Sequence, residues 1–214
     1  MIRGYLAKYL DRAAFFAIVA RYFSKYSSEY ALIEKAYVTA KREFRDKVRD
    51  QEGVRYFEHL RGVALILMLH LRVRDVNVIV AALLHDIMED IHGWTEDRLA
   101  LEFNPDVAML VFGVTKPDVS YYGGDKNARD RDYHLKLNMA DRRTILIKLA
   151  DRMHNLLTLW ATTEEKQKRK VRETQDFYLP IAEKHTVLIH ELEAAIAEIM
   201  DSWIRVEPVP IQCN

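Results

Sequence analysis

The sequence predicts an all-α fold in a single domain. Apolar residues recur at helical spacing along most of the 214-residue chain, and only seven glycines and five prolines interrupt them. No stretch shows the regular alternation of apolar and polar residues that is typical of a half-buried strand. Because half of the residues are hydrophobic, one domain of this length can bury a sizeable core. We expect a helical bundle with N-terminal helices in residues 1–45, a core in 46–190, and a C-terminal helix and tail in 191–214.

Charge and cysteine content argue against several classes of function. The 32 basic and 32 acidic residues balance, which gives no reason to expect specific binding to nucleic acid or to an acidic membrane surface. No apolar run approaches the roughly 20 residues that a membrane span needs. Cys213 is the only cysteine, so a disulfide framework is excluded and a reducing compartment is expected. We therefore expect a cytoplasmic protein without a membrane partner.

Three helices are expected in the first third of the chain. Apolar residues at helical spacing predict one helix over 6–23 and another over 56–71. Ser28 can cap a helix over 29–47, because a serine hydroxyl accepts a hydrogen bond from a free N–H of the first turn. The segment 47–55 is polar, contains a glycine and is typical of a loop.

Caps and short helices alternate in the middle of the chain. Asp75 is a candidate N-cap for a buried helix that continues to Asp90, and Thr95 and Pro105 each begin a shorter helix. The stretch 117–132 is polar and contains two consecutive glycines, which predicts a long loop. Loops of this length in compact domains are often functional, and we expect this one to close over a ligand as a mobile lid, with a surface connector as the alternative.

The last third is predicted to be helical again. Asp141 is expected to cap a strongly apolar helix that reaches Trp160. The charged run 163–170 is interpreted as a solvated connector or helix face. Two helices, over about 172–185 and 187–205, complete the chain before the tail.

Four ionisable residues end the buried helix that follows Asp75. At 3.6 residues per turn, His85 and Glu89 lie on one track of this helix, and Asp86 and Asp90 lie on the neighbouring one. An imidazole and three carboxylates at the end of a buried helix are costly unless something pairs with them, and a divalent cation would do so. From these residues alone, a solvated acidic turn at a helix end is an equally good interpretation.

Two more ionisable residues lie within apolar helices. His59 is near the start of the helix over 56–71, and Asp151 has hydrophobic neighbours. With His85 and Asp86 they make a donor set of two nitrogens and two carboxylates, which lacks thiolates and suits Mn²⁺, Fe²⁺, Mg²⁺ or an open Zn²⁺ site. Such a cation acidifies water into a nucleophile toward phosphorus, and Glu89 would then accept the proton with help from Asp90.

These residues resemble the H…HD…D signature of the HD superfamily of metal phosphohydrolases. Their context is similar to the hydrolase domain of RelA/SpoT homologues, which degrade the alarmone (p)ppGpp. The resemblance runs from about residue 40 to 190 and rests on five segments: Tyr56-Phe57-Glu58-His59 in the first ligand helix, His85-Asp86-Ile87-Met88-Glu89-Asp90 as HDxxED, Gly113-Val114-Thr115-Lys116 as GVTK, Lys148 to Asn155 as KLADRxHN, and Glu173-Thr174 with Pro180-Ile181-Ala182 as ET…PIA.

The resemblance implies a helical HD-type fold with one Mn²⁺ per chain. The metal ligands would be His59, His85, Asp86 and Asp151, and the catalytic acidic pair would be Glu89 and Asp90. The implied reaction is removal of the 3′-pyrophosphate from (p)ppGpp, which gives GDP or GTP and pyrophosphate.

The resemblance also implies nucleotide-binding residues. Arg49 lies where family members pack an arginine against the base, but its spacing to Gly53 is one residue longer than the family pattern, which leaves Arg55 open as well. Asn155 matches a ribose contact, and Thr158 falls where a threonine lies near the nucleotide. In the same motif, Lys148 and Arg152 would position phosphates or brace the ligands. His154 is interpreted as a residue that supports the ligands or packs beside them, not as a ligand itself.

Other substrates and one other class of function stay open. The metal motifs recognise only phosphate, so ppApp, the 2′-phosphate of NADPH or a pyrophosphorylated tRNA end are alternatives to ppGpp. About 25 residues follow the last motif, so the chain resembles a small stand-alone alarmone hydrolase. Some such hydrolases are antitoxins, which makes a toxic alarmone synthetase a candidate partner, neutralised by hydrolysis of its product rather than by contact.

Overall fold

The N-terminal helices lie where the sequence places them, with one division. The computed structural model describes residues 2–8, 11–49 and 53–204. The expected helix over 6–23 is two helices, α1 (Ile2–Lys8) and α2 (Arg12–Val19), and the Asp11 side chain caps α2 by accepting from the Ala14 N–H. Ser27, one residue before the predicted cap, accepts from the Tyr30 N–H and starts α3 (Ser28–Glu43).

The two helices that follow carry the first candidate residues of the site. Helix α4 (Phe57–Leu65) continues into the π-helix η1 (Ile66–His70), which together match the expected helix over 56–71. Asp75 caps α5 (Val76–Leu84) as predicted, because its carboxylate accepts from the N–H groups of Asn77 and Val78.

One continuous helix from residue 76 to Asp90 was expected, and this expectation is wrong. Helix α5 ends at Leu84, Asp86 leaves the helical conformation (φ −98°, ψ 2°), and the short α6 (Ile87–Asp90) follows. His85 and Glu89 therefore do not stack on one helical track. The turn instead places His85 and Asp86 directly after α5, whereas Glu89 and Asp90 lie on the separate helix α6.

The expected loop over 117–132 is also wrong over most of its length. After α7 (Glu96–Glu102) and α8 (Pro105–Val114), the chain forms the 3₁₀-helix η2 (Val119–Tyr122) and then α9 (Lys126–Asn138). Asp125 caps α9 by accepting from the N–H groups of Asn127 and Ala128, and Gly123 and Gly124 supply the positive φ angles of 60° and 90° that the turn needs. Lys126, Arg129 and Arg131, the cations in the second half of this stretch, are therefore helical residues.

The C-terminal part of the chain packs beside a long, mostly buried helix. Asp141 caps α10 (Arg142–Leu157), which ends three residues before Trp160. The elements after it are η3 (Leu159–Ala161), α11 (Glu164–Glu173), the π-helix η4 (Thr174–Tyr178), α12 (Leu179–His185) and α13 (Ile189–Ile204). The charged run is therefore the regular helix α11, capped by Thr163. The tail from residue 205 lies outside the described residues.

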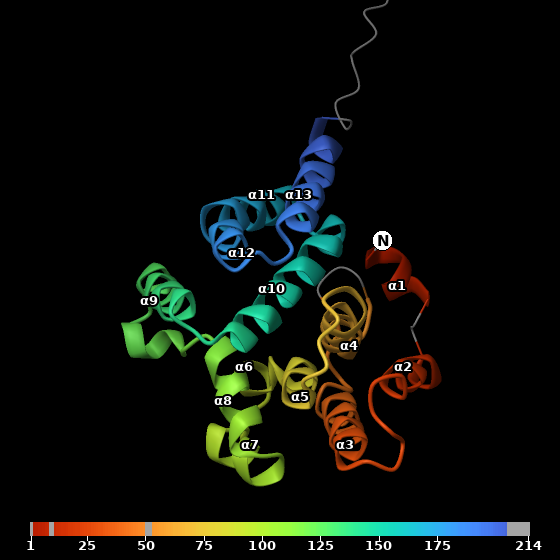
Figure 1. Cartoon of the computed structure of the whole chain (residues 1–214). Coiled ribbons are helices and arrows are strands. Elements are labelled where there is room, and N and C mark those ends of the chain that lie inside the picture. The colour runs from red at the N-terminus through yellow and green to blue at the C-terminus, as the bar shows by residue number, and fades with distance from the viewer. Residues whose placement is uncertain (1, 9–10, 50–52, 205–214) are drawn as a thin grey trace, which may run out of the picture.

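Helix α10 is the central element of the bundle. It crosses the middle of the molecule between the group α11–α13 and the group α3–α5, and it contacts α4, α5, α8 and α13 (Figure 1). Among the described residues the only bridge of the β type joins Val48 to Arg55, so the all-α prediction is confirmed. No described helix is both long and apolar enough to cross a membrane. Because α10 is buried along most of its length, polar side chains on it face protein rather than water.

Candidate metal centre

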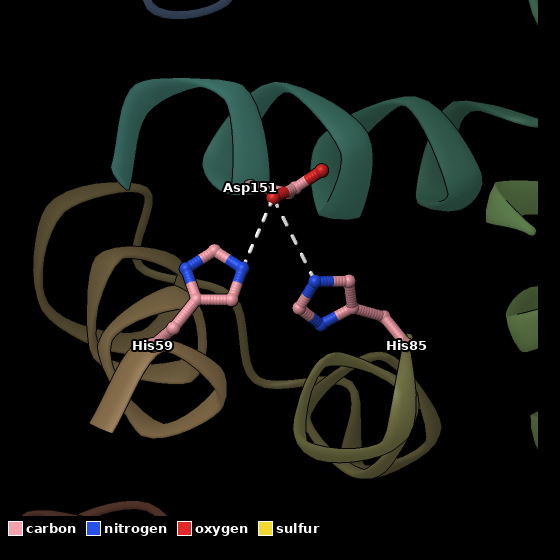
Figure 2. Close-up of side chains that lie close together, drawn as sticks. All are labelled: His59, His85 and Asp151. Atoms are coloured by element: carbon pink, nitrogen blue, oxygen red, sulfur yellow. Dashed lines mark ion pairs between the residues drawn. The ribbon is translucent and has the colours of Figure 1, made fainter. Parts of the chain in front are cut away.

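Three buried helices bring His59, His85 and Asp151 together. His59 is in the first turn of α4, His85 follows the last residue of α5, and Asp151 lies in the middle of α10. Figure 2 shows the two imidazoles facing the carboxylate from separate helices. One ligand atom from each of the three lies within 4.8 Å of the other two. All three side chains are almost fully buried.

Asp86 completes a cluster of four donor atoms. Its Oδ2 lies 3.1 Å from Nε2 of His85 and 3.7 Å from Nε2 of His59. Oδ1 of Asp151 lies 3.2 Å from Nε2 of His59 and 3.7 Å from Nε2 of His85. Ligands about 2.1 Å from a cation and at right angles to each other are about 3.0 Å apart, so these separations suit neighbouring positions around one ion.

The state of His85 supports a cation at this point. Its Nδ1 lies 2.9 Å from the carbonyl oxygen of Ala82, so Nδ1–H donates there and, in the neutral ring, Nε2 carries the lone pair. This Nε2 is buried and has no hydrogen-bond partner, although two carboxylates lie close to it. A lone pair aimed at carboxylate oxygens is repelled, and a cation between them removes the repulsion. The residues present therefore fit a divalent metal ion.

The carboxylates make the cluster strongly anionic. Burial by itself would lower the pKa of His85, but Asp86 and Asp151 raise it to about 10. Burial by itself would raise the pKa of Asp151, and Lys148 with the two histidines holds it well below its usual range. The cluster thus favours positive charge at its centre, supplied either by a proton on His85 or by a metal ion.

Three further side chains hold the two aspartates in place. The Tyr56 hydroxyl donates to Oδ2 of Asp86 at 2.7 Å, and the Asn155 amide donates to Oδ1 of Asp151 at 2.6 Å. Nζ of Lys148 lies 2.9 Å from Oδ2 of Asp151. Lys148 thus braces a candidate ligand. The role of Tyr56 was missed because a tyrosine near a helix start gives no signal that separates it from core aromatics.

The acidic pair lies at the edge of the cluster. Glu89 accepts from the backbone N–H of Lys116 at 2.6 Å and keeps part of its side chain exposed, while Asp90 pairs with Lys47 at 3.2 Å. Desolvation raises the pKa of Glu89 and Asp86 adds to the rise, although Lys148 and the Lys116 N–H act in the opposite direction. A carboxylate with a raised pKa at the rim of a metal centre can act as a proton acceptor.

Arg49 reaches the cluster from the segment before α4. Its guanidinium donates to Oδ1 of Asn155 at 2.7 Å and lies 3.2 Å from Nδ1 of His59 and 3.4 Å from Nδ1 of His154. Arg55 instead pairs with Glu58 near the surface. Of the two arginines that the sequence left open, the structure brings only Arg49 into the site. Residues 50–52, where the spacing departs from the family pattern, lie outside the described residues.

A cavity of about 290 Å³ adjoins the cluster. Tyr56 and Asn155 line it and also bond to the cluster's carboxylates, so the cavity opens directly beside the donor atoms. Thr158, predicted to lie near a nucleotide, is another wall residue. The cationic side chains that line the cavity are Arg49, Arg152, Lys166 and Lys170. We call this space the cationic cavity.

Two of these cations come from the charged run that the sequence favours as a solvated connector or helix face. Lys166 and Lys170 are four residues apart on α11 and therefore share one face of that helix. That face turns toward the cavity. Sequence alone cannot distinguish a solvated charged helix from one that lines a polar cavity, because both present the same charges at the same spacing.

Glu173 links the cationic cavity to α10 and to the segment that follows α8. Its carboxylate lies 2.9 Å from Arg152, 2.8 Å from Lys170 and 3.8 Å from Lys116. Burial would raise the pKa of Glu173, but these cations hold it far below its usual range. The ion pairs therefore stabilise the fold at neutral pH, and the contribution is lost as the pH falls from about 4.5, the ordinary value, toward the depressed value.

We expect Glu173→Gln to lower the free energy of unfolding at pH 7 by about 3 kcal/mol, because it leaves buried cations without their carboxylate. Urea unfolding at pH 7 and at pH 3.5 measures the effect, and the difference from the unsubstituted protein should be smaller at the acidic pH. The matched control is Glu164→Gln, which removes an exposed, solvent-screened ion pair with Lys168 and should leave stability nearly unchanged. Equal losses for the two variants would contradict the role of Glu173.

Comparisons with known proteins match most of the chain. A family model described as HD domain matches residues 36–188. The chain is 36% identical over 170 residues to the bifunctional (p)ppGpp synthase/hydrolase SpoT of Escherichia coli K12, which covers 78% of this chain and 23% of that protein. It is 39% identical over 136 residues to the guanosine-3′,5′-bis(diphosphate) 3′-pyrophosphohydrolase of Haemophilus influenzae, covering 62% and 19%. The chain therefore spans about a fifth to a quarter of the length of these relatives.

A solved structure resembles the fold over nearly its whole length. It belongs to a metazoan orthologue of SpoT that is described as hydrolysing ppGpp and acting in starvation responses. The TM-score is 0.67 at 26% identity, and the match covers 83% of this chain and 97% of that one. Most of this chain thus has a structural counterpart in that protein.

Proposed function

The chain belongs to the HD-domain family and is homologous to the SpoT and RelA proteins, and from this premise we propose that it is a metal-dependent (p)ppGpp 3′-pyrophosphohydrolase. The observation that supports this most strongly is the position of a four-donor cluster beside a cavity with a cationic wall. A nucleotide with two diphosphates needs a centre that activates water and side chains that offset its negative charge. The products are GDP or GTP and pyrophosphate.

In the proposed mechanism the chain's own residues bind, orient and move a proton. His59, His85, Asp86 and Asp151 would hold a divalent cation, which supplies Lewis-acid chemistry toward water and phosphate. Glu89 accepts a proton from water as the water oxygen bonds to phosphorus and the bond between phosphorus and the 3′-oxygen breaks. The 3′-oxygen takes up a proton and leaves as the hydroxyl group of GDP or GTP. Asp90, held by Lys47, fixes the turn that carries Glu89.

Arg49, Asn155 and Thr158 are proposed to bind the nucleoside, and the other cavity cations its phosphates. Arg49 donates to Asn155, which in turn donates to the ligand Asp151, so a nucleoside that contacts either residue lies next to the metal centre. Arg152, Lys166 and Lys170 face the same space from α10 and α11. Lys148 has Asp151 as its partner, and we assign it to bracing that ligand.

The direct test is incubation of purified protein with ppGpp and Mn²⁺, followed by quantification of GDP and pyrophosphate. We expect turnover that a chelator stops and that added Mn²⁺ restores. Mn²⁺ is our proposal because a mixed set of nitrogen and oxygen donors suits it, and the same assay with Mg²⁺, Fe²⁺ and Zn²⁺ tests that choice. A folded sample that releases no pyrophosphate with any of these metals would refute the proposal.

The alternatives that the sequence left open are separated by substrate comparison. The value of kcat/KM is measured for ppGpp, ppApp and NADPH under one condition. A preference for ppGpp of tenfold or more, about 1.4 kcal/mol, supports guanine recognition. A cytoplasmic location remains part of the proposal. So does neutralisation of a toxic synthetase by hydrolysis of its product, which depends on the same activity.

A further inference from the structure

The two histidines of the donor cluster are held in different ways. His85 donates its Nδ1–H to the carbonyl oxygen of Ala82 within its own helix, which fixes the ring with the Nε2 lone pair toward the cluster. His59 makes no such bond to a carbonyl among the described contacts. Its Nδ1 faces Nδ1 of His154 at 3.0 Å and Nη1 of Arg49 at 3.2 Å. The orientation of His59 therefore depends on a side chain from α10.

His59 can bind a cation only if its Nε2 carries a lone pair, and this requires a hydrogen-bond acceptor beside its Nδ1. A neutral imidazole has one N–H and one lone pair, so Nε2 can bind a cation only when Nδ1 carries the hydrogen. Arg49 has no acceptor atom and cannot receive that hydrogen. Nδ1 of His154, 3.0 Å away, can receive it through its one lone pair. His154 thus accepts the Nδ1–H of His59, just as the backbone carbonyl of Ala82 accepts the Nδ1–H of His85.

A glycine on α4 makes room for this ring. Gly62 is three residues after His59, so the two lie on one face of the helix. A β-carbon at residue 62 would lie 2.2 Å from Nε2 and 2.3 Å from Cδ2 of His154, far inside contact distance. Gly62 has no positive φ, and a glycine inside a helix costs about 1 kcal/mol relative to alanine, so the backbone gives no reason for it. The contact with His154 does.

We propose that His154 is a positioning residue that fixes the metal-binding tautomer of His59, and that Gly62 is required because it admits the His154 ring. The proposal depends on the metal site of the proposed function but not on the identity of the substrate. It gives His154 a specific role, since a residue that only packs needs volume whereas this one needs an acceptor atom.

The first experiment separates the acceptor from the volume. The dissociation constant for Mn²⁺ alone, without nucleotide, is measured for the unsubstituted protein, His154→Asn and His154→Leu. Asparagine and leucine have nearly the same shape and lose the ring equally, but only asparagine places an oxygen near the original Nδ1. We expect Leu to weaken Mn²⁺ binding by about 10–100-fold, the usual effect of losing a partner of a ligating histidine, and Asn to recover most of it. Equal affinities in the two variants would overturn the positioning role.

The second experiment tests the link to Gly62 with a double-mutant cycle. Gly62→Ala should weaken Mn²⁺ binding as His154→Leu does, because the new methyl group displaces the ring. In a His154→Ala background the same substitution has no ring to displace, so it should cause no further loss. A full additional loss in that background would show that Gly62 acts independently of His154 and would overturn the second part of the proposal.

The readouts keep this inference separate from the proposed function. Thermal unfolding in chelator checks that each variant folds, and the Ala/Ala double variant carries no steric conflict if Gly62→Ala alone fails to fold. Because no nucleotide is present, a protein inactive toward ppGpp still gives a result. If the unsubstituted protein binds no Mn²⁺, the metal site itself is wrong and the inference falls with it. Equal Asn and Leu affinities reject only the role of His154.

Discussion

Glu89→Gln is expected to remove turnover while leaving metal affinity nearly unchanged. The amide keeps the shape of the side chain and can still accept from the Lys116 N–H, but it cannot take a proton from water. Loss of a general base lowers kcat by about 10²–10⁴-fold. The measurement pairs kcat on ppGpp with the Mn²⁺ dissociation constant. Glu96→Gln, a similar change at an exposed residue in the first turn of α7, is the control and should keep full activity.

The pH dependence of the same reaction tests the assignment independently. The base must be ionised, so the rate falls as the pH drops through the pKa of Glu89. Because desolvation raises that pKa, the acid limb should lie above the 4.5 of an ordinary glutamate. The residual rate of Glu89→Gln should lack this limb. If the variant keeps the acid limb, or if its Mn²⁺ affinity falls by as large a factor as its kcat, the proton acceptor is another residue.

The sequence predicts the local features of this fold well because they depend on neighbouring residues. Caps such as Asp75 and Asp141 are recognisable from the residue type and the apolar run that follows, and both are confirmed. The prediction of secondary structure fails where a short polar stretch can form either a loop or a capped helix. Residues 117–132 contain both a Gly-Gly turn and Asp125, and the cap decides in favour of helix α9. The end of α5 is similar, since periodicity cannot signal the turn at Asp86.

The candidate site was predictable in its ligand atoms but not in their partners. His59, His85 and Asp151 stand out because ionisable residues inside apolar helices need a reason, and the structure brings all three together with Asp86. The partners are ordinary residues that become informative only in space. Arg49 and His154 are 105 residues apart in the chain, and Lys166 and Lys170 look like any charged helix face. Neither spacing nor residue type indicates such contacts.

Asp151→Asn is expected to remove metal binding and to destabilise the protein through a different atom. Oδ1 faces the two histidines, so loss of the negative charge removes an anionic ligand from the centre. Oδ2 pairs with Lys148 at 2.9 Å, so the same substitution leaves a buried ammonium group without its partner. Losing one partner of a buried pair costs about 3–5 kcal/mol. Metal affinity and urea unfolding in chelator measure the two effects separately.

A second substitution distinguishes these two effects of Asp151. In Asp151→Asn/Lys148→Met the unpaired ammonium is gone and an apolar chain of similar length fills its place, so stability in chelator should recover by most of the loss. Mn²⁺ binding should not recover, because the carboxylate ligand is still absent. The residue would then serve two separable purposes, one as a metal ligand and one as the counter-ion that allows Lys148 to be buried in α10. Recovery of metal binding in the double variant would mean that Lys148, rather than the missing carboxylate, had excluded the cation from the asparagine variant.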